Sequence, residues 1–391
     1  MSAGAFCKGL EGELMAITSY CTNIHPGESW QEIFSAVRRH VPAVKQRVSP
    51  HAPFPLGLRL SGRAAQEMSA RDADEFYGWC RDNDVYVATI NAFPFGTFHH
   101  TPVKQSVYLP DWRHPQRLTY TQQVAALLDQ WLPDKMTGSI STVPGGFRTS
   151  LSEKDFPEIK KHLVAALDYL EALRQKSGKE ILLSLEPEPG CLLETTADVL
   201  AFFSRLALSP SHRSLLAVCY DCCHQALQYE DPAESLHQLA AHEIRIGHVQ
   251  VSSALRLTHP DIGRLRRFCE SCYLHQTVGR TKAGELLRFA DLDQAIAAAP
   301  DNVEEWRVHF HVPVFLEATT ECATTRFFLD RILPLFPDGT PMEVETYTWT
   351  VLPAELRCEM VTDSISREIE WVESARKRPM KDRAVKVCAG I

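Results

Sequence analysis

The chain has 391 residues, of which 45% are hydrophobic and 23% are charged, as expected for a globular protein with a sizeable core. Its formal net charge of −8 argues against a general nucleic-acid or anionic-membrane binder, because such proteins are usually basic. The N-terminal residues lack the pattern of a signal peptide, and no window approaches the run of about 18 apolar residues that a membrane helix needs. We therefore expect a cytoplasmic protein whose 12 cysteines are reduced.

Short β-branched or apolar runs alternate with amphipathic stretches along the chain. The expected strands, eight in number, cover residues 14–21, 56–60, 85–93, 138–143, 180–188, 214–221, 244–251 and 342–348. The clearest expected helices cover residues 28–41, 158–178, 196–208, 231–242 and 324–336. Eight βα units at this length favour a single α/β domain, a (β/α)8 TIM barrel, over an open doubly wound sheet. The absence of a glycine-rich phosphate loop and of a GxSxG motif argues in the same direction.

We expect the barrel domain to cover residues 1–375. About ninety residues separate its seventh and eighth strands, and we interpret residues 255–320 as an insertion that passes over the barrel mouth. The strand-like HFHVP (309–313) would form a small hairpin with HQTVGR (275–280) rather than a ninth barrel strand. The tail, residues 376–391, is basic and without periodicity, so we expect it to be disordered.

Polar residues end four consecutive expected strands, and the active site of a TIM barrel lies at the carboxyl ends of its strands. These residues are Glu186 and Glu188 on the fifth strand, Asp221 and His224 on the sixth, His248 and Gln250 on the seventh, and Glu343 and Glu345 on the eighth. Carboxylates and imidazoles together suit a divalent ion, with Mn²⁺ or Zn²⁺ favoured and Mg²⁺ or Co²⁺ also compatible. A shared cation would offset the cost of burying these groups. Cys222 and Cys223 lack partner cysteines at zinc spacing, so we interpret them as packing residues.

This ordered set of residues resembles the sugar isomerase and epimerase barrels related to xylose isomerase, a superfamily that also includes endonuclease IV. Its members carry a Glu at the end of strand five, a D-x-x-H motif on strand six, a His on strand seven and a Glu on strand eight. The resemblance implies that the metal ligands are Glu186, Asp221, His248 and Glu345. It also implies that Glu186 and Glu345 act as the acid–base pair and that His224 contacts a substrate oxygen or orients a ligand.

The activity that this resemblance implies is an isomerase or epimerase reaction by proton transfer next to a metal-bound carbonyl. The substrate would be a small polar metabolite such as a sugar, a cyclitol or another polyol, with or without a phosphate group. Among the mouth residues, the predicted substrate contacts are His25, Arg59, Asn91 and Gln250. Arg59 and Lys104 could hold an anionic group or could form structural ion pairs.

Two alternatives to a simple isomerase remain open. His309 and His311 fall where the endonuclease IV-like members carry a D-x-H pair that binds a further metal, so they would bind a second metal or the substrate. With a second metal, the chain would be a multi-metal phosphoesterase, although its acidic character makes a nucleic-acid substrate a poor choice. Without turnover, it would be a barrel that binds a metabolite and passes it on.

A closer resemblance covers nearly the whole chain. YCTNIHPGESW (20–30), INAFPFGTFH (90–99), HFHVPVF (309–315) and VETYTWTVLP (344–353) resemble the bacterial EboE family. This resemblance implies a role in metabolite traffic, with protein partners encoded in the same operon. The lack of a long apolar run separately predicts no membrane insertion. It does not imply a particular reaction.

Overall fold

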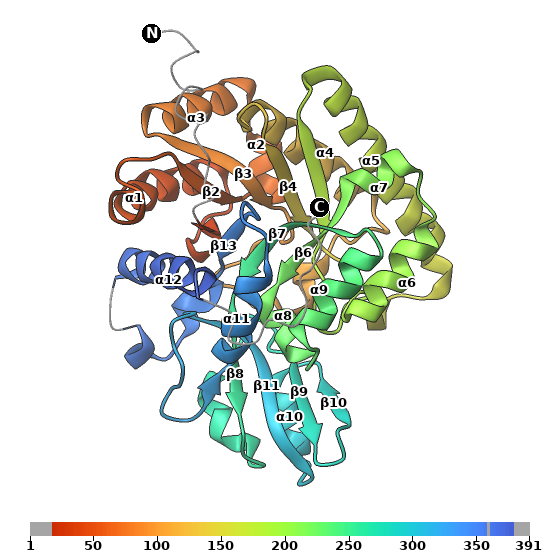
Figure 1. Cartoon of the computed structure of the whole chain (residues 1–391), viewed down its shortest axis with the longest axis vertical. Helices are drawn as coiled ribbons and strands as arrows, with labels where there is room; N and C mark the ends of the chain where they lie inside the picture. The colour runs from red at the N-terminus through yellow and green to blue at the C-terminus, as the bar shows by residue number, and fades with distance from the viewer. Residues whose placement is uncertain (1–17, 358–359, 379–391) are drawn as a thin grey trace.

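The structure is a computed structural model that describes residues 18–357 and 360–378. Eight parallel strands form its core (Figure 1). Their bounds are β1 Ser19–Tyr20, β2 Phe54–Arg59, β3 Val85–Asn91, β4 Thr137–Thr142, β5 Glu180–Leu185, β6 Leu216–Asp221, β7 Arg245–Val251 and β13 Met342–Val344. Neighbouring strands follow in the order β1-β13-β7-β6-β5-β4-β3-β2, and a parallel bridge between Cys21 and Gly57 joins the two ends of this order. The predicted TIM barrel is confirmed.

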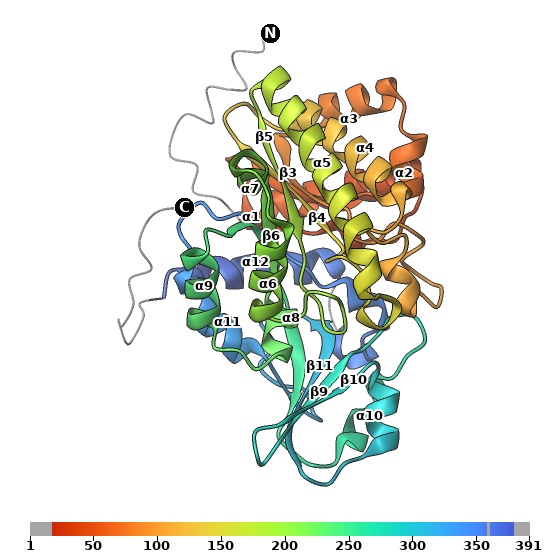
Figure 2. The same ribbon diagram turned by 90° about the vertical axis from the view of Figure 1, so that its right-hand side faces the viewer.

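Helices surround the barrel, as Figures 1 and 2 show. They are α1 Trp30–Val48, α2 Gly62–Glu67, α3 Ala70–Asp82, α4 Pro115–Trp131, α5 Phe156–Ser177, α6 Thr196–Leu206, α7 Pro210–Leu215, α8 Cys222–Leu227, α9 Pro232–Ala241, α11 Arg326–Ile332 and α12 Val361–Arg376. Ser29 begins α1 with a capping box, in which its hydroxyl accepts from the Glu32 amide while the Glu32 carboxylate accepts from the Ser29 amide. Within the described ranges, no helix has the length and apolar character that a membrane span requires.

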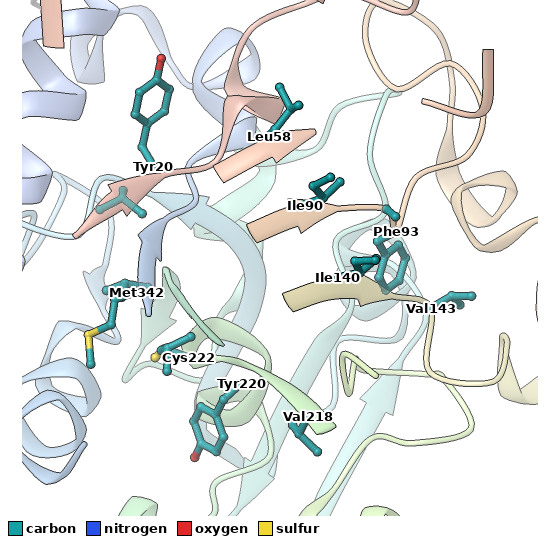
Figure 3. Close-up of a cluster of buried hydrophobic side chains, with 14 of the residues drawn as sticks. Tyr20, Leu58, Ile90, Phe93, Ile140, Val143, Val218, Tyr220, Cys222 and Met342 are labelled. Atoms are coloured by element: carbon teal, nitrogen blue, oxygen red, sulfur yellow. The ribbon is translucent and has the colours of Figure 1, made fainter. Parts of the chain in front are cut away.

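The outer surface of the barrel strands packs against these helices and forms the core. Leu58, Ile90, Ile140 and Val218, from four different strands, are fully or almost fully buried (Figure 3). Burying a side chain of this size contributes roughly 1.5–3 kcal/mol. The inner surface of the barrel is different, because it carries polar side chains that lead to the mouth.

A second, antiparallel sheet is inserted between β7 and β13, and it extends the molecule beyond the carboxyl ends of the barrel strands (Figure 2). Its strands are β8 Ser253–Leu257, β9 Thr277–Thr281, β10 Leu286–Phe289, β11 Val303–Val312 and β12 Ala323–Thr324, in the order β10-β9-β11-β8-β12, with α10 at Leu292–Ala298. The predicted insertion is therefore present. Residues 309–312 lie on β11 and residues 277–280 on β9, and these strands pair antiparallel, although β10 and α10 separate them along the chain.

Several predicted boundaries differ from the structure. The last barrel strand ends at Val344 and a short 3-10 helix, η8 (Tyr347–Val351), follows it, whereas the sequence predicted a strand to residue 348. The first helix continues through Pro42 to Val48, beyond its predicted end at residue 41. Residues 14–17 of the first predicted strand, and the predicted tail from residue 379 onward, lie outside the described residues.

Candidate active site and metal centre

Three carboxylates converge at the barrel mouth. Glu186 directly follows β5, Asp221 ends β6 and Glu345 follows β13, and each offers an oxygen within 4.8 Å of the other two. Backbone hydrogen bonds extend the parallel ladder to two of them, because the Glu186 amide donates to Thr142 O and the Glu345 amide donates to Val251 O. The barrel therefore brings together three of the four predicted metal ligands.

Burial makes this carboxylate cluster costly without a cation. Glu186, Asp221 and Glu345 are all at most 4% exposed. Burial raises the pKa of Glu186 well above its usual range, and the nearby Asp221 carboxylate raises it further. Burial also raises the pKa of Glu345 well above its usual range, with Glu186 as the next cause. The pKa of Asp221 is raised by burial as well, although His311 partly offsets that shift.

Two carboxylate oxygens in this cluster have no hydrogen-bond partner. They are Glu186 Oε2 and Asp221 Oδ2, both buried. Two other oxygens of the cluster are held in place, because Asp221 Oδ1 accepts from the His224 amide (2.8 Å) and Glu345 Oε1 accepts from the Asn23 amide group (2.7 Å). Buried carboxylate oxygens without donors are uncommon, and a bound cation is a standard way to satisfy them. The residues present therefore fit a divalent metal ion.

Three histidines lie beside the carboxylates, and each has its Nδ1 fixed by an oxygen acceptor. Nδ1 of His224 lies 2.9 Å from Pro187 O, and Nδ1 of His311 lies 2.8 Å from Glu345 O. A backbone carbonyl can only accept, so these Nδ1 atoms carry the proton and Nε2 keeps its lone pair. His309 Nδ1 lies 2.6 Å from the amide oxygen of Gln276, which leads to the same tautomer.

The three Nε2 atoms are crowded around His309. Its Nε2 lies 3.2 Å from His224 Nε2 and 3.1 Å from His311 Nε2. Burial lowers the pKa of His224 to about 3 and that of His311 to about 4, so these rings are neutral at pH 7. Two lone pairs at this distance repel, whereas two imidazoles on one tetrahedral Zn²⁺, with bonds of about 2.0–2.1 Å, have their nitrogens roughly 3.3 Å apart. The histidines thus fit a second cation.

Some of the residue groups that contain these histidines also contain a carboxylate of the site. Residue groups that could share one ion include Glu188 with His224 and His309, Asp221 with His224 and His311, and Cys223 with His309 and His311. The nearest imidazole contact of the carboxylate cluster also comes from β11, since His311 Nδ1 lies 3.5 Å from Glu345 Oε2. The insertion therefore supplies imidazoles to the barrel site.

His248, the predicted imidazole ligand, is not brought into this cluster. The strand register places it opposite Cys219 of β6, two residues below Asp221. Its Nδ1 lies 2.7 Å from Ser139 Oγ and its Nε2 lies 3.3 Å from Cys219 Sγ, so the ring occupies the barrel interior. Gln250 also points inward and donates to Glu343 Oε1 (2.6 Å).

The remaining predicted substrate residues divide between the cavity and the surrounding structure. Asn91 lines the cavity and donates to Glu345 Oε1 (3.0 Å). His25 does not line the cavity, since its Nε2 contacts Tyr20 Oη and its ring stacks on His40. Arg59 lies outside the cavity lining as well.

The residues of the site line a small cavity of about 50 Å³. Its lining includes Glu186, Glu188, His224, His309, His311, Glu345, Asn23, Asn91, Tyr108, Phe98, Tyr273 and Tyr347. Glu188 lies at the centre of one wall, where its Oε1 accepts from Tyr108 Oη (2.7 Å) and from the Gln276 amide group (3.2 Å). Burial raises its pKa to about 7.

Sequence comparison identifies the fold family. A family model described as a xylose isomerase-like TIM barrel matches residues 54–300. The chain belongs to this family. No curated protein sequence matches the chain.

Several solved structures match most of the chain at low sequence identity. A xylose isomerase-like TIM barrel protein from Mycobacterium smegmatis in complex with magnesium has a TM-score of 0.53 at 10% identity and covers 93% of this chain and 97% of its own. L-ribulose 3-epimerase has a TM-score of 0.49 at 12% identity, with coverages of 93% and 96%. The IOLI protein with a bound zinc atom has a TM-score of 0.47 at 11% identity, with coverages of 93% and 98%. At sequence identities of 10–12%, the similarity shows a shared fold and nothing about the reaction.

Sequence reasoning missed several residues of this xylose isomerase-like site. Gln276 lies in a loop and Tyr108 ends the short 3-10 helix η3 (Lys104–Tyr108), so their position in the site depends on tertiary contacts. Asn23 follows the short first strand, and its polar character directly after a strand was a usable signal. Glu188 was set aside in favour of Glu186, yet both side chains line the cavity.

Proposed function

We propose that the chain is a metal-dependent isomerase or epimerase of a small sugar, cyclitol or related polyol. The observation that carries this proposal is the cluster of Glu186, Asp221 and Glu345, with buried and unpartnered oxygens at the carboxyl end of the barrel. These three residues would hold Mn²⁺ or Zn²⁺, with His311 as the nearest imidazole. The ion would supply polarisation of a substrate carbonyl, which acidifies the neighbouring C–H.

The residues of the cluster differ in their freedom to move a proton. Glu345 is tied through Oε1 to Asn23 and Asn91. Glu186 has one oxygen without any donor. Glu186 is thus the better proton carrier, and Glu345 is the partner that would complete an acid–base pair. His224, with its Nδ1 fixed on Pro187 O, can present Nε2 to a substrate oxygen.

Solvent proton exchange tests this proposal directly. The purified chain, loaded with Mn²⁺ or Zn²⁺, is incubated in D₂O with a panel of ketoses, aldoses and inososes, and loss of the C–H signal next to the carbonyl is followed by NMR. Exchange should require the metal and should fall at least ~100-fold in Glu186→Gln. The exposed Glu285→Gln serves as a matched control and should keep full exchange. Equal exchange without metal, or in Glu186→Gln, would contradict the proposal.

The crowded histidines support a second candidate function, metal-assisted phosphoester hydrolysis. That chemistry uses two or three ions that clamp the attacking and leaving oxygens. His309 and His311 would have to act as ligands for an additional ion. A single equivalent of metal per chain, unchanged in His309→Ala, would exclude it.

The resemblance to EboE leads us to propose a role in metabolite traffic with operon-encoded protein partners. Two of the resembling segments build the site, because HFHVPVF contains His309 and His311 and VETYTWTVLP contains Glu345 and Tyr347. A barrel that binds a metabolite without turning it over would keep the metal and show no C–H exchange across the panel.

A further inference from the structure

Gln276 holds His309 through both its backbone and its side chain. It directly precedes β9 and is 3% exposed. Its backbone oxygen accepts from the His309 amide (2.9 Å), and its side-chain Oε1 lies 2.6 Å from His309 Nδ1. His224 and His311 are fixed in a different way, because backbone carbonyls occupy the corresponding place beside their Nδ1 atoms. Among these three histidines, His309 is thus the one whose Nδ1 partner a substitution can remove.

Residues that follow β3 and β5 fix the orientation of the Gln276 amide group. Its Nε2 lies 2.9 Å from Pro189 O, which can only accept, so this end of the group carries the NH2. The same Nε2 lies 2.7 Å from Tyr108 Oη, and the Tyr108 hydroxyl gives its own proton to Glu188 Oε1 (2.7 Å). A rotated amide would place two oxygen acceptors against each other at Pro189, which is unfavourable. The carbonyl oxygen of Gln276 therefore faces His309 and accepts its Nδ1 proton.

The alternative tautomer of His309 would suit the empty histidine cluster better. With its proton on Nε2, His309 would donate to the lone pair of His224 Nε2 or His311 Nε2, which lie 3.2 and 3.1 Å away. With its proton on Nδ1, three lone pairs face one another, and only the Tyr347 hydroxyl (3.3 Å) can donate to His309 Nε2 among these neighbours. Gln276 thus stabilises the tautomer that the empty cluster disfavours. Metal-binding histidines commonly donate their second ring N–H in this way, which fixes both the tautomer and the orientation of the ring.

We propose that Gln276 is a positioning residue that controls cation binding at the three histidines. It holds the Nδ1 proton of His309 and so keeps the Nε2 lone pair available to the ion. The inference goes beyond the proposed function, which places its ion on the carboxylates. It also explains the hydrogen bonds among Tyr108, Glu188 and Pro189, since these residues orient the Gln276 amide group.

Nitrogen NMR of the metal-free full chain tests the tautomer. The histidines are labelled with ¹⁵N, and the His309 signals are identified by their loss in His309→Ala. We expect His309 to carry its proton on Nδ1 in the native chain. In Gln276→Met, whose sulfur is only a weak acceptor, we expect Nε2 to carry the proton in at least half of the molecules. The signals of His224 and His311 should keep the Nδ1 proton in both proteins, which also shows that the site remains folded.

Two results of this experiment would overturn the inference. One is a proton on His309 Nε2 in the native chain, which requires no variant to detect. The other is a folded Gln276→Met in which His309 keeps its proton on Nδ1. A purely structural role for Gln276 would change the stability of the chain and leave the tautomer as it is.

Titration with Zn²⁺ tests the consequence for cation binding. The histidine site is defined as the Zn²⁺ equivalent that is lost in His309→Ala, since imidazoles suit this ion. Competition with a chelating dye should show that Gln276→Met weakens this equivalent tenfold or more and changes the carboxylate equivalent less than threefold. The exposed control Gln46→Met should change neither.

Equal affinity at the histidine site in the native chain and Gln276→Met would overturn the inference, as would a native chain without such an equivalent. Neither measurement involves turnover. Absence of C–H exchange would therefore count against the proposed function and not against this inference, so the two failures are distinguishable.

Discussion

Replacing Glu188 by glutamine should stabilise the metal-free protein, and increasingly so as the pH rises. The pKa of Glu188 rises from 4.5 to about 7 on folding, because burial disfavours its ionised form. The folded state therefore holds the proton more tightly than the unfolded state. That contribution to stability is complete below pH 4.5 and is lost as the pH rises through 7. In Glu188→Gln the new amide side chain stays neutral throughout, and its oxygen can accept both hydrogen bonds.

The size of the stability difference between the two proteins follows from the raised pKa of Glu188. A shift of 2.5 pKa units, from 4.5 to about 7, corresponds to about 3 kcal/mol by pH 8, against less than about 1 kcal/mol at pH 5. For 391 residues, an unfolding entropy of about 2.1 cal/mol/K per residue makes this a rise in Tm of about 4 °C. Calorimetry of the metal-free native chain, Glu188→Gln and the exposed control Glu285→Gln between pH 5 and 8 measures it. A stability difference that does not change with pH would refute the reasoning.

Three further predictions concern neighbouring positions. His311→Ala should weaken Mn²⁺ or Zn²⁺ binding at least tenfold, whereas His248→Ala should change it less than threefold, as measured by competition with a chelating dye. Gly57→Ala should destabilise the chain by about 2 kcal/mol or more in urea unfolding, because the new Cβ would lie 1.8 Å from Glu343 Oε2. Cys223→Ser should keep one full equivalent of metal by elemental analysis, and loss of that metal would show that the thiol is a ligand.

The barrel could be predicted because each strand is buried on both surfaces and reads as a short apolar run between helices. The helix α5 could also be predicted from the sequence, because its apolar positions recur at helical spacing and Gly178 ends it in the left-handed conformation. The helix α4 was missed because its sequence mixes polar, aromatic and small residues, so that its buried positions depend on packing against the barrel. The helix α3 did carry a signal, since Ala73, Phe76 and Cys80 recur at helical spacing after the capping residue Ser69.

The candidate site was predictable in part, for a geometric reason. Glu186, Asp221 and Glu345 lie at the carboxyl ends of three parallel barrel strands, β5, β6 and β13, so their convergence at the mouth follows from the parallel barrel. The place of His248 depends on register, and a bulge between β6 and β7 sets it one layer below the mouth. Whether His309 and His311 reach the site depends on how the insertion folds back over the barrel. No local sequence pattern determines that arrangement.

We propose that Glu186, Asp221 and Glu345 bind a divalent metal ion. The most direct test of this proposal is elemental analysis of the native chain and Asp221→Asn after incubation with Mn²⁺ or Zn²⁺ and exhaustive dialysis. The asparagine keeps an oxygen acceptor for the start of α8, so the variant should fold, and circular dichroism checks this. We predict at least one equivalent of metal in the native chain and less than about 0.1 equivalent in Asp221→Asn. Full metal content in the folded variant would contradict the account.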